Sequence, residues 1–300
     1  MNLRNLRGII PTLSTIFTAK GDIDVRGMQS LVRFSLDQGV NGLAVGMVAG
    51  EFYKLNDNER KKVMRLVIDE ADGKVPVLAG TSYSGTEPAI ELGAYAKDIG
   101  AEGIVVMPPY FMKKESAVFV FEHYSRIASA IDLPLMIQDA EEDIFVPIEL
   151  SFYPKIAKEF SHVFMVKVES LEPLKRIGEI QDLMGGRMHT YGAKSIIDEF
   201  DLGAYGHVPS SGLTDLFVKL FNDYQNGVKD IKRSDTYIKY RRYLAFRARY
   251  PLLSAGIEKE ILRRRGVIDS TYVRGPSPKM SATARRELGK LLNQIGYSDG

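Results

Sequence analysis

Residues 75–107, VPVLAGTSYSGTEPAIELGAYAKDIGAEGIVVM, contain one complete strand–helix–strand unit. The apolar run Val75–Ala79 predicts a buried strand, and the apolar residues within Thr86–Ile99 then return at helical spacing. Gly100 follows this helical stretch and precedes the next apolar run, Gly103–Met107. Glycine supplies the left-handed conformation that ends a helix before the chain enters another strand. The stretch therefore predicts two parallel strands joined by a helix.

The same unit recurs, so that eight strand–helix pairs occupy the chain up to about residue 228. The other expected strands are 8–13, 42–45, 134–137, 163–168, 187–191 and 204–208. The other expected helices are 25–38, 56–71, 115–130, 148–160, 171–183, 195–202 and 213–226. Strict alternation indicates a parallel sheet with crossover helices. Eight units favour a closed (β/α)8 barrel over an open doubly wound sheet, which typically has fewer strands and a glycine-rich phosphate loop after the first one.

The pattern changes after residue 228. Three helical stretches are expected, at 230–249, 253–265 and 281–295, and no further strand-like run is present in the sequence. The sequence therefore predicts a barrel of residues 1–228 and a helical C-terminal extension of residues 229–300 within the same structural unit. The many arginines of this extension are interpreted as a solvated helix face, in preference to a nucleic-acid surface.

The composition narrows the possible classes of function. The 300 residues are 45% hydrophobic and 26% charged, as in globular proteins, and no apolar run is long enough to span a membrane. The N-terminus does not resemble a secretory signal, so we expect a cytoplasmic protein. The absence of cysteine excludes disulfides, thiolate metal sites and a catalytic thiol, and the four histidines are scattered. A formal charge of +2 gives no reason to expect nucleic acid or a membrane as a partner, and we expect no metal.

A lysine interrupts one of the apolar strands. Lys167 lies near the carboxyl end of VFMVKV (163–168), and active sites of (β/α)8 enzymes lie at the carboxyl ends of the strands. An ammonium in such a strand needs a partner or a purpose. Burial makes a lysine easier to deprotonate, and a neutral amine can attack a ketone to form a Schiff base. The other interpretation is a lysine that pairs with a carboxylate near the rim.

Glu169 follows Lys167 by two positions. In a strand, residues two apart point to the same side, so these two side chains are expected to lie next to each other. A carboxylate beside an imine is well placed to move protons at the neighbouring carbon. Glu169 could also hold Lys167 in a salt bridge, and the two roles are compatible.

Two other strand ends carry conformationally special residues. The turn Gly46–Glu51, GMVAGE, has two closely spaced glycines that allow backbone N–H groups to converge on an anion, although a plain tight turn fits equally well. Pro108 and Pro109 hold Tyr110 rigidly at the end of another strand, where a packing tyrosine is the alternative.

A polar pair, Gln138 and Asp139, follows the apolar strand 134–137. His189 and His207 are expected near the mouth of the barrel as ordinary polar residues. Two rim loops, 111–116 and 210–214, are expected to determine the length of substrate that the site accepts.

Several of these features occur together in one known family. In chain order they are a Gly-Glu turn (Gly50, Glu51), Pro-x-Tyr (108–110), an apolar–Lys segment (165–167), Gly-x-x-Lys-x-x-Leu (256–262) and Arg-x-Pro (274–276). In this order and spacing the chain resembles the dihydrodipicolinate synthase / N-acetylneuraminate lyase family over nearly its whole length.

The resemblance implies a function and a set of site residues. Lys167 would be the Schiff-base lysine and would take a 2-keto acid, with Glu169 and Tyr110 as the other catalytic residues. The substrate would be bound by the turn residues Met47, Val48, Ala49, Gly50 and Glu51, largely through their backbone, and by Gln138, Asp139 and Val208. The resemblance implies no cofactor and no metal, and a homodimer or homotetramer.

The sequence departs from the family pattern at three places, one of which is the loop 141–143 (Glu-Glu-Asp), where the arginine of the family is absent. The usual turn has two hydroxyl residues where this chain has Val48 and Ala49, and the usual strand-five Tyr-Asn is replaced by Gln138-Asp139, so that the proton-relay tyrosine is missing.

The segments 137–140 (Ile-Gln-Asp-Ala) and 107–110 (Met-Pro-Pro-Tyr) and the pair Lys167-x-Glu169 look more like the branch that contains L-2-keto-3-deoxyarabonate dehydratase. The leading hypothesis is therefore dehydration of a 2-keto-3-deoxy sugar acid. A pyruvate-dependent aldolase or synthase and a non-catalytic barrel that binds keto acids are the alternatives.

Overall fold

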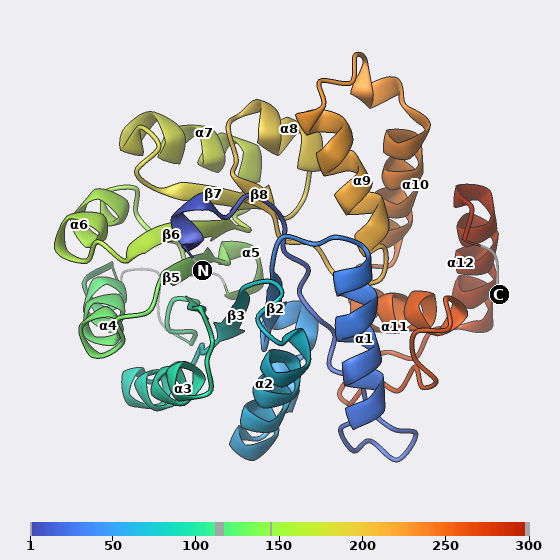
Figure 1. Cartoon of the computed structure of the whole chain (residues 1–300), viewed down its shortest axis with the longest axis horizontal. Helices are drawn as coiled ribbons and strands as arrows, with labels where there is room; N and C mark the ends of the chain where they lie inside the picture. The colour runs from blue at the N-terminus through green and yellow to red at the C-terminus, as the bar shows by residue number, and fades with distance from the viewer. Residues whose placement is uncertain (1, 112–116, 145, 298–300) are drawn as a thin grey trace.

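Eight parallel strands form the centre of the protein, with helices between them. The computed structural model describes residues 2–111, 117–144 and 146–297. The strands are β1 (Gly8–Ile9), β2 (Leu43–Val45), β3 (Val77–Gly80), β4 (Gly103–Val106), β5 (Leu135–Asp139), β6 (Val163–Val168), β7 (His189–Gly192) and β8 (Gly206–His207). The hydrogen-bonded order β1-β8-β7-β6-β5-β4-β3-β2 follows the chain around the sheet, and Figure 1 shows the helices outside it.

The sheet closes at its first strand. β1 pairs with β8 through Gly8 and Gly206, and Thr12 bridges in parallel to Ala44 of β2 on one side and to Ser210 on the other. The N–H groups of Leu13 and Ala44 donate across the same seam. These bonds confirm the predicted (β/α)8 barrel, and they place the polar segment around Thr12 at the carboxyl-terminal mouth.

The helices between the strands follow the expected order. They are α1 (Val25–Asp37), α2 (Asp57–Ala71), α3 (Thr86–Asp98), α4 (Ala117–Ala130), α5 (Glu141–Ile144), α6 (Phe152–Glu159), α7 (Pro173–Met184), α8 (Ile196–Asp201) and α9 (Thr214–Gln225). Local sequence explains their ends. Asn56 and Glu59 form a reciprocal capping box at the start of α2, and Gly185 adopts a left-handed conformation after α7.

Two helices begin several residues later than expected. The helix expected at 230–249 begins at Asp235, after a 3-10 turn at Ile231–Arg233, and the other follows β5. The helix expected at 148–160 begins only at Phe152, and the short helix α5 precedes it. Val146 and Ile148 are buried, and the carbonyl of Ile148 accepts a hydrogen bond from the Arg176 guanidinium instead of a helical N–H. Packing against α7 therefore holds this segment outside the helix.

The apolar core has two layers. The inner layer fills the barrel and includes Ile10, Ala44, Leu78, Val105, Met136, Met165 and Tyr191. The outer layer lies between the strands and the surrounding helices and contains most of the other buried apolar residues. Along β6 the alternation of the strand sends Met165 and Lys167 into the barrel. The lysine lies one layer above the apolar filling, where the barrel opens.

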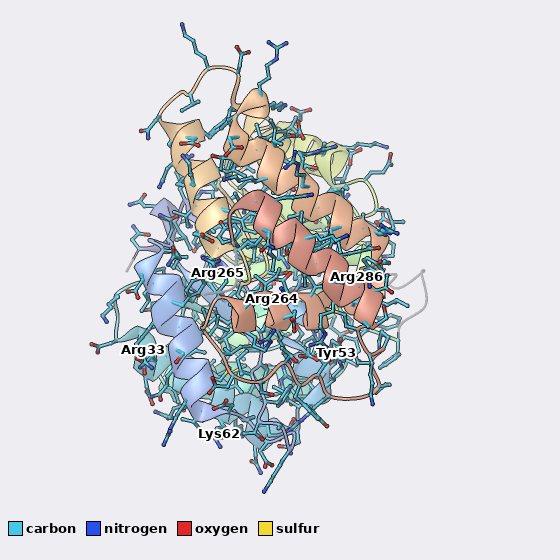
Figure 2. The ribbon with its side chains drawn as sticks, turned by 90° about the vertical axis from the view of Figure 1, so that its right-hand side faces the viewer. Arg33, Tyr53, Lys62, Arg264, Arg265 and Arg286 are labelled. Atoms are coloured by element: carbon cyan, nitrogen blue, oxygen red, sulfur yellow. The ribbon has the colours of Figure 1, made fainter. Side chains whose placement is uncertain are left out.

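The C-terminal extension contains α10 (Asp235–Arg249), α11 (Ser254–Arg264) and α12 (Ala282–Ile295), with short 3-10 turns before α10 and α11. Figure 1 shows these helices gathered on one side of the barrel, and Figure 2 shows α12 lying across α11. Arg285 of α12 donates to the buried Glu260 of α11, which joins the two helices. The division of the chain at residue 228 stays a prediction.

A buried ion pair attaches the extension to the barrel. Lys259 of α11 is fully buried, and its Nζ lies 2.5 Å from Oε2 of Glu51, which is 1% exposed. Lys54 contacts Oε1 of the same carboxylate at 2.9 Å. Burial lowers the pKa of Lys259, although the Glu51 carboxylate opposes that shift. Glu51 itself has the left-handed φ of 60° that the turn requires.

Arg274 makes a second attachment close to the first. Its guanidinium donates to the carbonyls of Gly21 and Lys54 and pairs with Glu59 of α2 at 2.6 Å. Lys259 and Arg274 both lie over the ring of Phe17, at 4.5 and 4.4 Å from its centroid. The two C-terminal motifs therefore hold the extension against the segment that follows β2.

We predict that Lys259→Ala lowers the free energy of unfolding by about 3 kcal/mol, because it removes one partner of a buried ion pair and leaves Glu51 with Lys54 alone. Chemical denaturation of both proteins at pH 7 measures the difference. The control is Lys219→Ala, an exposed lysine of α9, for which a change within about 0.5 kcal/mol is expected. Equal effects of the two substitutions would contradict this account of the attachment.

Candidate active site

A cavity of about 770 Å³ opens at the carboxyl ends of the strands. This volume is in the usual range for small-molecule sites. The wall contributed by the barrel includes Thr12, Val48, Ala49, Lys167, Glu169 and Val208. The wall contributed by the extension includes Tyr243, Leu244, Arg247, Pro251, Leu252 and Ser254. The cavity is therefore formed jointly by the barrel mouth and the C-terminal helices.

Lys167 and Glu169 lie together inside this cavity, as the spacing predicts. The Lys167 Nζ is 2.6 Å from Glu169 Oε1, and the two side chains are 4% and 16% exposed. Gln138, opposite Lys167 on β5, donates its amide N–H to Glu169 Oε2 at 2.7 Å. The carboxylate thus has the lysine on one oxygen and the amide on the other. This arrangement can exchange a proton between amine and carboxylate while Gln138 holds the carboxylate in place.

Asp139 points the other way along β5. Its carboxylate accepts hydrogen bonds from the Tyr153 hydroxyl at 2.8 Å and from the Arg176 Nε at 2.9 Å. These partners belong to α6 and α7, outside the barrel. Burial raises the pKa of Tyr153, so that its hydroxyl stays a donor to Asp139. The structure therefore brings Gln138 to the lysine but places Asp139 in the packing between strand and helices.

The turn after β2 contributes backbone and apolar side chains to the cavity. Val48 and Ala49 line it, whereas Met47 is buried in the barrel and accepts a hydrogen bond from the Thr12 hydroxyl. The carbonyl of Gly50 accepts from Thr15 at 2.6 Å. Glu51 also lines the cavity, but Lys54 and Lys259 occupy its carboxylate. Its main contribution is therefore to fix the turn.

Tyr110 packs beside the mouth in a small cluster with Phe52, Met107 and Ala140. It is not among the residues that line the cavity. Burial raises the pKa of its hydroxyl, with the nearby Arg60 opposing that shift. Most of the loop expected to set substrate length, residues 112–116, lies outside the described residues, whereas Ser210 of the other loop lines the cavity.

A buried carboxylate beside the cavity was not expected from the sequence. Glu199 of α8 accepts N–H groups from Ala193, Lys194 and Ser195 on one oxygen and contacts His207 Nδ1 at 2.6 Å with the other. Ala193 and Lys194 line the cavity. A Cβ on Gly192 would lie 1.8 Å from the Glu199 carboxylate, so only glycine fits there.

The two histidines lie in different places. His207 lines the cavity and contacts Glu199, as just described. His189 begins β7, at the opposite end of the barrel from the mouth, where it stacks on Tyr205 with ring centroids 3.7 Å apart. The expectation that both histidines approach the mouth is therefore wrong for His189. This residue is the first of β7, and the mouth lies at the other, carboxyl end of that strand.

Arg247 lines the cavity and is the second functional candidate that the sequence interpretation missed. It was included among the solvated arginines of the extension, but its guanidinium donates to Ser210 at 2.9 Å and also to Ser254. A signal for this position existed. Tyr240, Tyr243 and Arg247 follow each other at helical spacing, and both tyrosines are buried. Arg247 therefore lies on the face of α10 that contacts the barrel.

Within residues 2–111, 117–144 and 146–297, no group of three or more histidine, aspartate or glutamate side chains is arranged to hold a metal ion. In the same part of the chain, none of the helices combines the length and the apolar character needed to cross a membrane.

The fold and the paired Lys167 and Glu169 at the mouth are those of a (β/α)8-barrel enzyme, with its polar groups where such enzymes carry out their chemistry. A comparison with family models then identifies the family. The model of the dihydrodipicolinate synthetase family matches residues 5–295, and the chain belongs to this family. Its members are Schiff-base lyases and aldolases, so the chain is an enzyme of that general kind.

Three proteins with similar sequences illustrate the activities found among relatives of this chain. The chain is 28% identical to L-2-keto-3-deoxyarabonate dehydratase of Azospirillum brasilense, over 96% of this chain and 94% of that protein. It is also 28% identical, over 96% of each chain, to YagE of Escherichia coli K12, provisionally named a 2-dehydro-3-deoxy-D-gluconate aldolase. A crystal structure of YagE in complex with pyruvate superposes with a TM-score of 0.86, at 27% identity, and covers 96% of this chain and 98% of YagE. A 4-hydroxy-tetrahydrodipicolinate synthase of Methanopyrus kandleri is 36% identical over 55% of each chain.

We predict that Glu199→Gln lowers the free energy of unfolding by about 2 kcal/mol at pH 7, because charge-assisted hydrogen bonds become neutral ones. Although burial raises the pKa of Glu199, His207 and the backbone donors bring that pKa below its usual value. Stability from such a carboxylate is present above its unfolded pKa and is lost as the pH falls through the lowered, folded one. The difference between wild type and variant should therefore be full above about pH 5 and shrink below about pH 4.3.

Denaturation curves between pH 3 and pH 7 measure this difference. A difference that stays constant over this range would show that the charge of Glu199 does not stabilise the loop. The exposed Glu172→Gln serves as a control and should leave the stability within about 0.5 kcal/mol at each pH.

Proposed function

We propose that this protein is a Schiff-base lyase that dehydrates a 2-keto-3-deoxy sugar acid, with Lys167 as the imine-forming residue. The observation that carries the proposal is the contact of 2.6 Å between Lys167 Nζ and Glu169 Oε1 inside the cavity. A lysine at this depth with an adjoining carboxylate has both of the groups that imine chemistry needs, a nucleophile and a proton carrier.

Imine formation follows from this contact. Glu169 takes a proton from the Lys167 ammonium, and the neutral amine attacks the C2 carbonyl carbon of the keto acid. The resulting carbinolamine loses its hydroxyl as water after Glu169 returns the proton. The product is a protonated imine that joins Lys167 to C2 of the substrate. Gln138 keeps the carboxylate of Glu169 next to the reacting nitrogen throughout.

Dehydration then uses the imine as an electron sink. Glu169 removes a proton from C3, and the electrons of that C–H bond form an enamine with the C2–N bond. The enamine expels the C4 hydroxyl, which takes a proton from Glu169 and leaves as water. Hydrolysis of the imine releases a product that retains every carbon of the substrate and restores the Lys167 amine. No external cofactor takes part in these steps.

The residue on β5 supports this assignment of proton transfer to Glu169. A glutamine amide does not exchange protons as a tyrosine hydroxyl does, and Gln138 lies at the strand end where the family pattern has its relay tyrosine. Asp139 is engaged with Arg176 and Tyr153 away from the cavity. Glu169 is therefore the proton carrier with direct access to the lysine.

The substrate carboxylate would be held by the backbone of Val48 and Ala49 at the barrel mouth, and Val208 would contact the carbon chain. The proposed role of Glu51 is to fix this turn through its two lysines. Tyr110 as a catalytic residue, a cytoplasmic location and a homodimer or homotetramer stay predictions.

The similarity to a dehydratase over almost the whole of both chains favours the dehydration. An aldolase is the second candidate, and the equal identity to YagE and the structure of YagE in complex with pyruvate favour it. The same imine would then promote cleavage of the C3–C4 bond, with pyruvate and an aldehyde as products.

We predict that the protein converts a 2-keto-3-deoxy sugar acid into a product that keeps all the carbons of the substrate. Mass spectrometry of the reaction mixture, with a coupled lactate dehydrogenase assay for pyruvate, distinguishes the two reactions. Loss of one water without pyruvate supports the dehydratase. Formation of one pyruvate per substrate consumed would contradict the dehydratase and support the aldolase.

We predict that Glu169→Gln still forms the adduct with a keto acid but lowers kcat by about 10²–10⁴-fold, the usual contribution of a general acid–base group. Lys167→Ala should abolish turnover. The matched control is Glu172→Gln, an exposed glutamate just beyond the same strand, which should keep the wild-type kcat. Unchanged turnover in Glu169→Gln would remove Glu169 from the mechanism.

A further inference from the structure

The far wall of the cavity carries a guanidinium that the proposed reaction does not use. Arg247 of α10 lines the cavity, and its side chain is 29% exposed. Its guanidinium donates hydrogen bonds to three hydroxyl groups. Nη1 donates to Ser210 at 2.9 Å and to the Tyr243 hydroxyl at 3.2 Å, and Nη2 donates to Ser254. The position of the guanidinium is therefore fixed before any ligand binds.

The carboxylate that balances Arg247 lies behind it. Glu258 is 3.3 Å from Nη1, but it is 1% exposed, and it also accepts the Tyr243 hydroxyl at 2.5 Å and the N–H of Gly212 at 2.9 Å. Glu258 does not line the cavity, whereas Arg247 does. A molecule in the cavity therefore meets the cation and not its partner.

The contacts described for Arg247 do not use all of its N–H groups. A guanidinium carries five N–H donors, and the contacts described for Arg247 involve Nη1 and Nη2. Among the described residues, the structure gives Nε no acceptor. The planar edge of a guanidinium matches the geometry of a carboxylate, which can accept two parallel hydrogen bonds from it.

Apolar side chains form much of the wall of the cavity that Lys167 and Arg247 line. Leu244, Pro251 and Leu252 from the extension contribute to it, and Val48 and Val208 contribute from the barrel. At about 770 Å³ it is in the range of sites that hold ligands much larger than pyruvate. Lys167 from the barrel and Arg247 from the extension thus line one cavity, together with apolar side chains that a carbon chain could contact.

We infer that the substrate is a 2-keto acid with a second carboxylate at its far end, and that Arg247, with Ser210 and Ser254, binds that carboxylate. This inference rests on the proposed function, since it takes the imine at Lys167 as the point that fixes the other end of the substrate. It narrows the sugar acids considered above to those that are acids at both ends.

The test compares pairs of keto acids that have the same number of carbons. These acids lack the C4 hydroxyl, so they can form the imine but cannot be dehydrated. The diacids 2-oxoglutarate, 2-oxoadipate and 2-oxopimelate are matched with 2-oxopentanoate, 2-oxohexanoate and 2-oxoheptanoate. Each is incubated with the full-length protein and reduced with borohydride, and the concentration that gives half of the maximal adduct is read from the intact mass. For at least one chain length we expect half-saturation by the diacid at a concentration at least about tenfold lower, because a charge-assisted hydrogen bond is gained.

Three substitutions identify the cation responsible. In Arg247→Gln the ratio between the two acids of the preferred pair should fall to about one. Arg242→Gln, an exposed arginine on the same helix, should keep the wild-type ratio. Lys194→Gln tests a further basic side chain of the cavity wall and should also keep the wild-type ratio. Thermal denaturation of Arg247→Gln checks that the variant is folded. The comparison of diacids with monoacids on the wild-type protein tests the inference even if this variant does not fold.

The outcomes separate this inference from the proposed function. If pyruvate and the monoacids form adducts but no diacid is preferred at any length, the inference is overturned and the imine stands. A preference that survives Arg247→Gln and is lost in Lys194→Gln overturns the assignment to Arg247. If none of the keto acids, pyruvate included, forms an adduct, the proposed function fails and the inference fails with it.

Discussion

The ion pair between Lys259 and Glu51 is the interaction on which the shape of the site depends. It is buried at both ends and joins α11 to the turn after β2, two segments that are more than two hundred residues apart in sequence. Both segments line the cavity, one through Val48 and Ala49 and the other through Ser254 and Ala255. Because a buried pair is costly to break, the barrel mouth and the extension are held in a fixed relation.

This constraint gives the cavity two chemically different walls. The barrel contributes Lys167 and Glu169 at the end of β6, with Gln138 on the neighbouring strand to orient the carboxylate. The extension contributes apolar residues and Arg247, which Ser210 and Ser254 hold in position. A barrel without the extension would carry Lys167 but would have no second wall to contact the rest of a substrate.

The sequence was sufficient for the fold and for part of the site, for identifiable physical reasons. The alternation of apolar runs, glycines and helical spacing is a local signal, and the observed strands and helices follow it closely. The proximity of Lys167 and Glu169 also follows from local geometry, because residues two apart in a strand share a side. The outward direction of Asp139 needs knowledge of what packs on β5, and the contacts of Arg247 need the tertiary position of α10. The helical spacing of Tyr240, Tyr243 and Arg247 indicates a shared face. However, Arg247 and Asp139 each contact a residue from a distant segment of the chain.

The central claim is that Lys167 forms the imine, and one measurement tests it most directly. The protein is incubated with pyruvate and reduced with borohydride, and its peptides are analysed by mass spectrometry to locate the adduct. The account predicts one added pyruvate-derived group, on the peptide that contains Lys167, and none in Lys167→Ala. An adduct on Lys194 or Lys259 instead, or no adduct at saturating pyruvate, would contradict it.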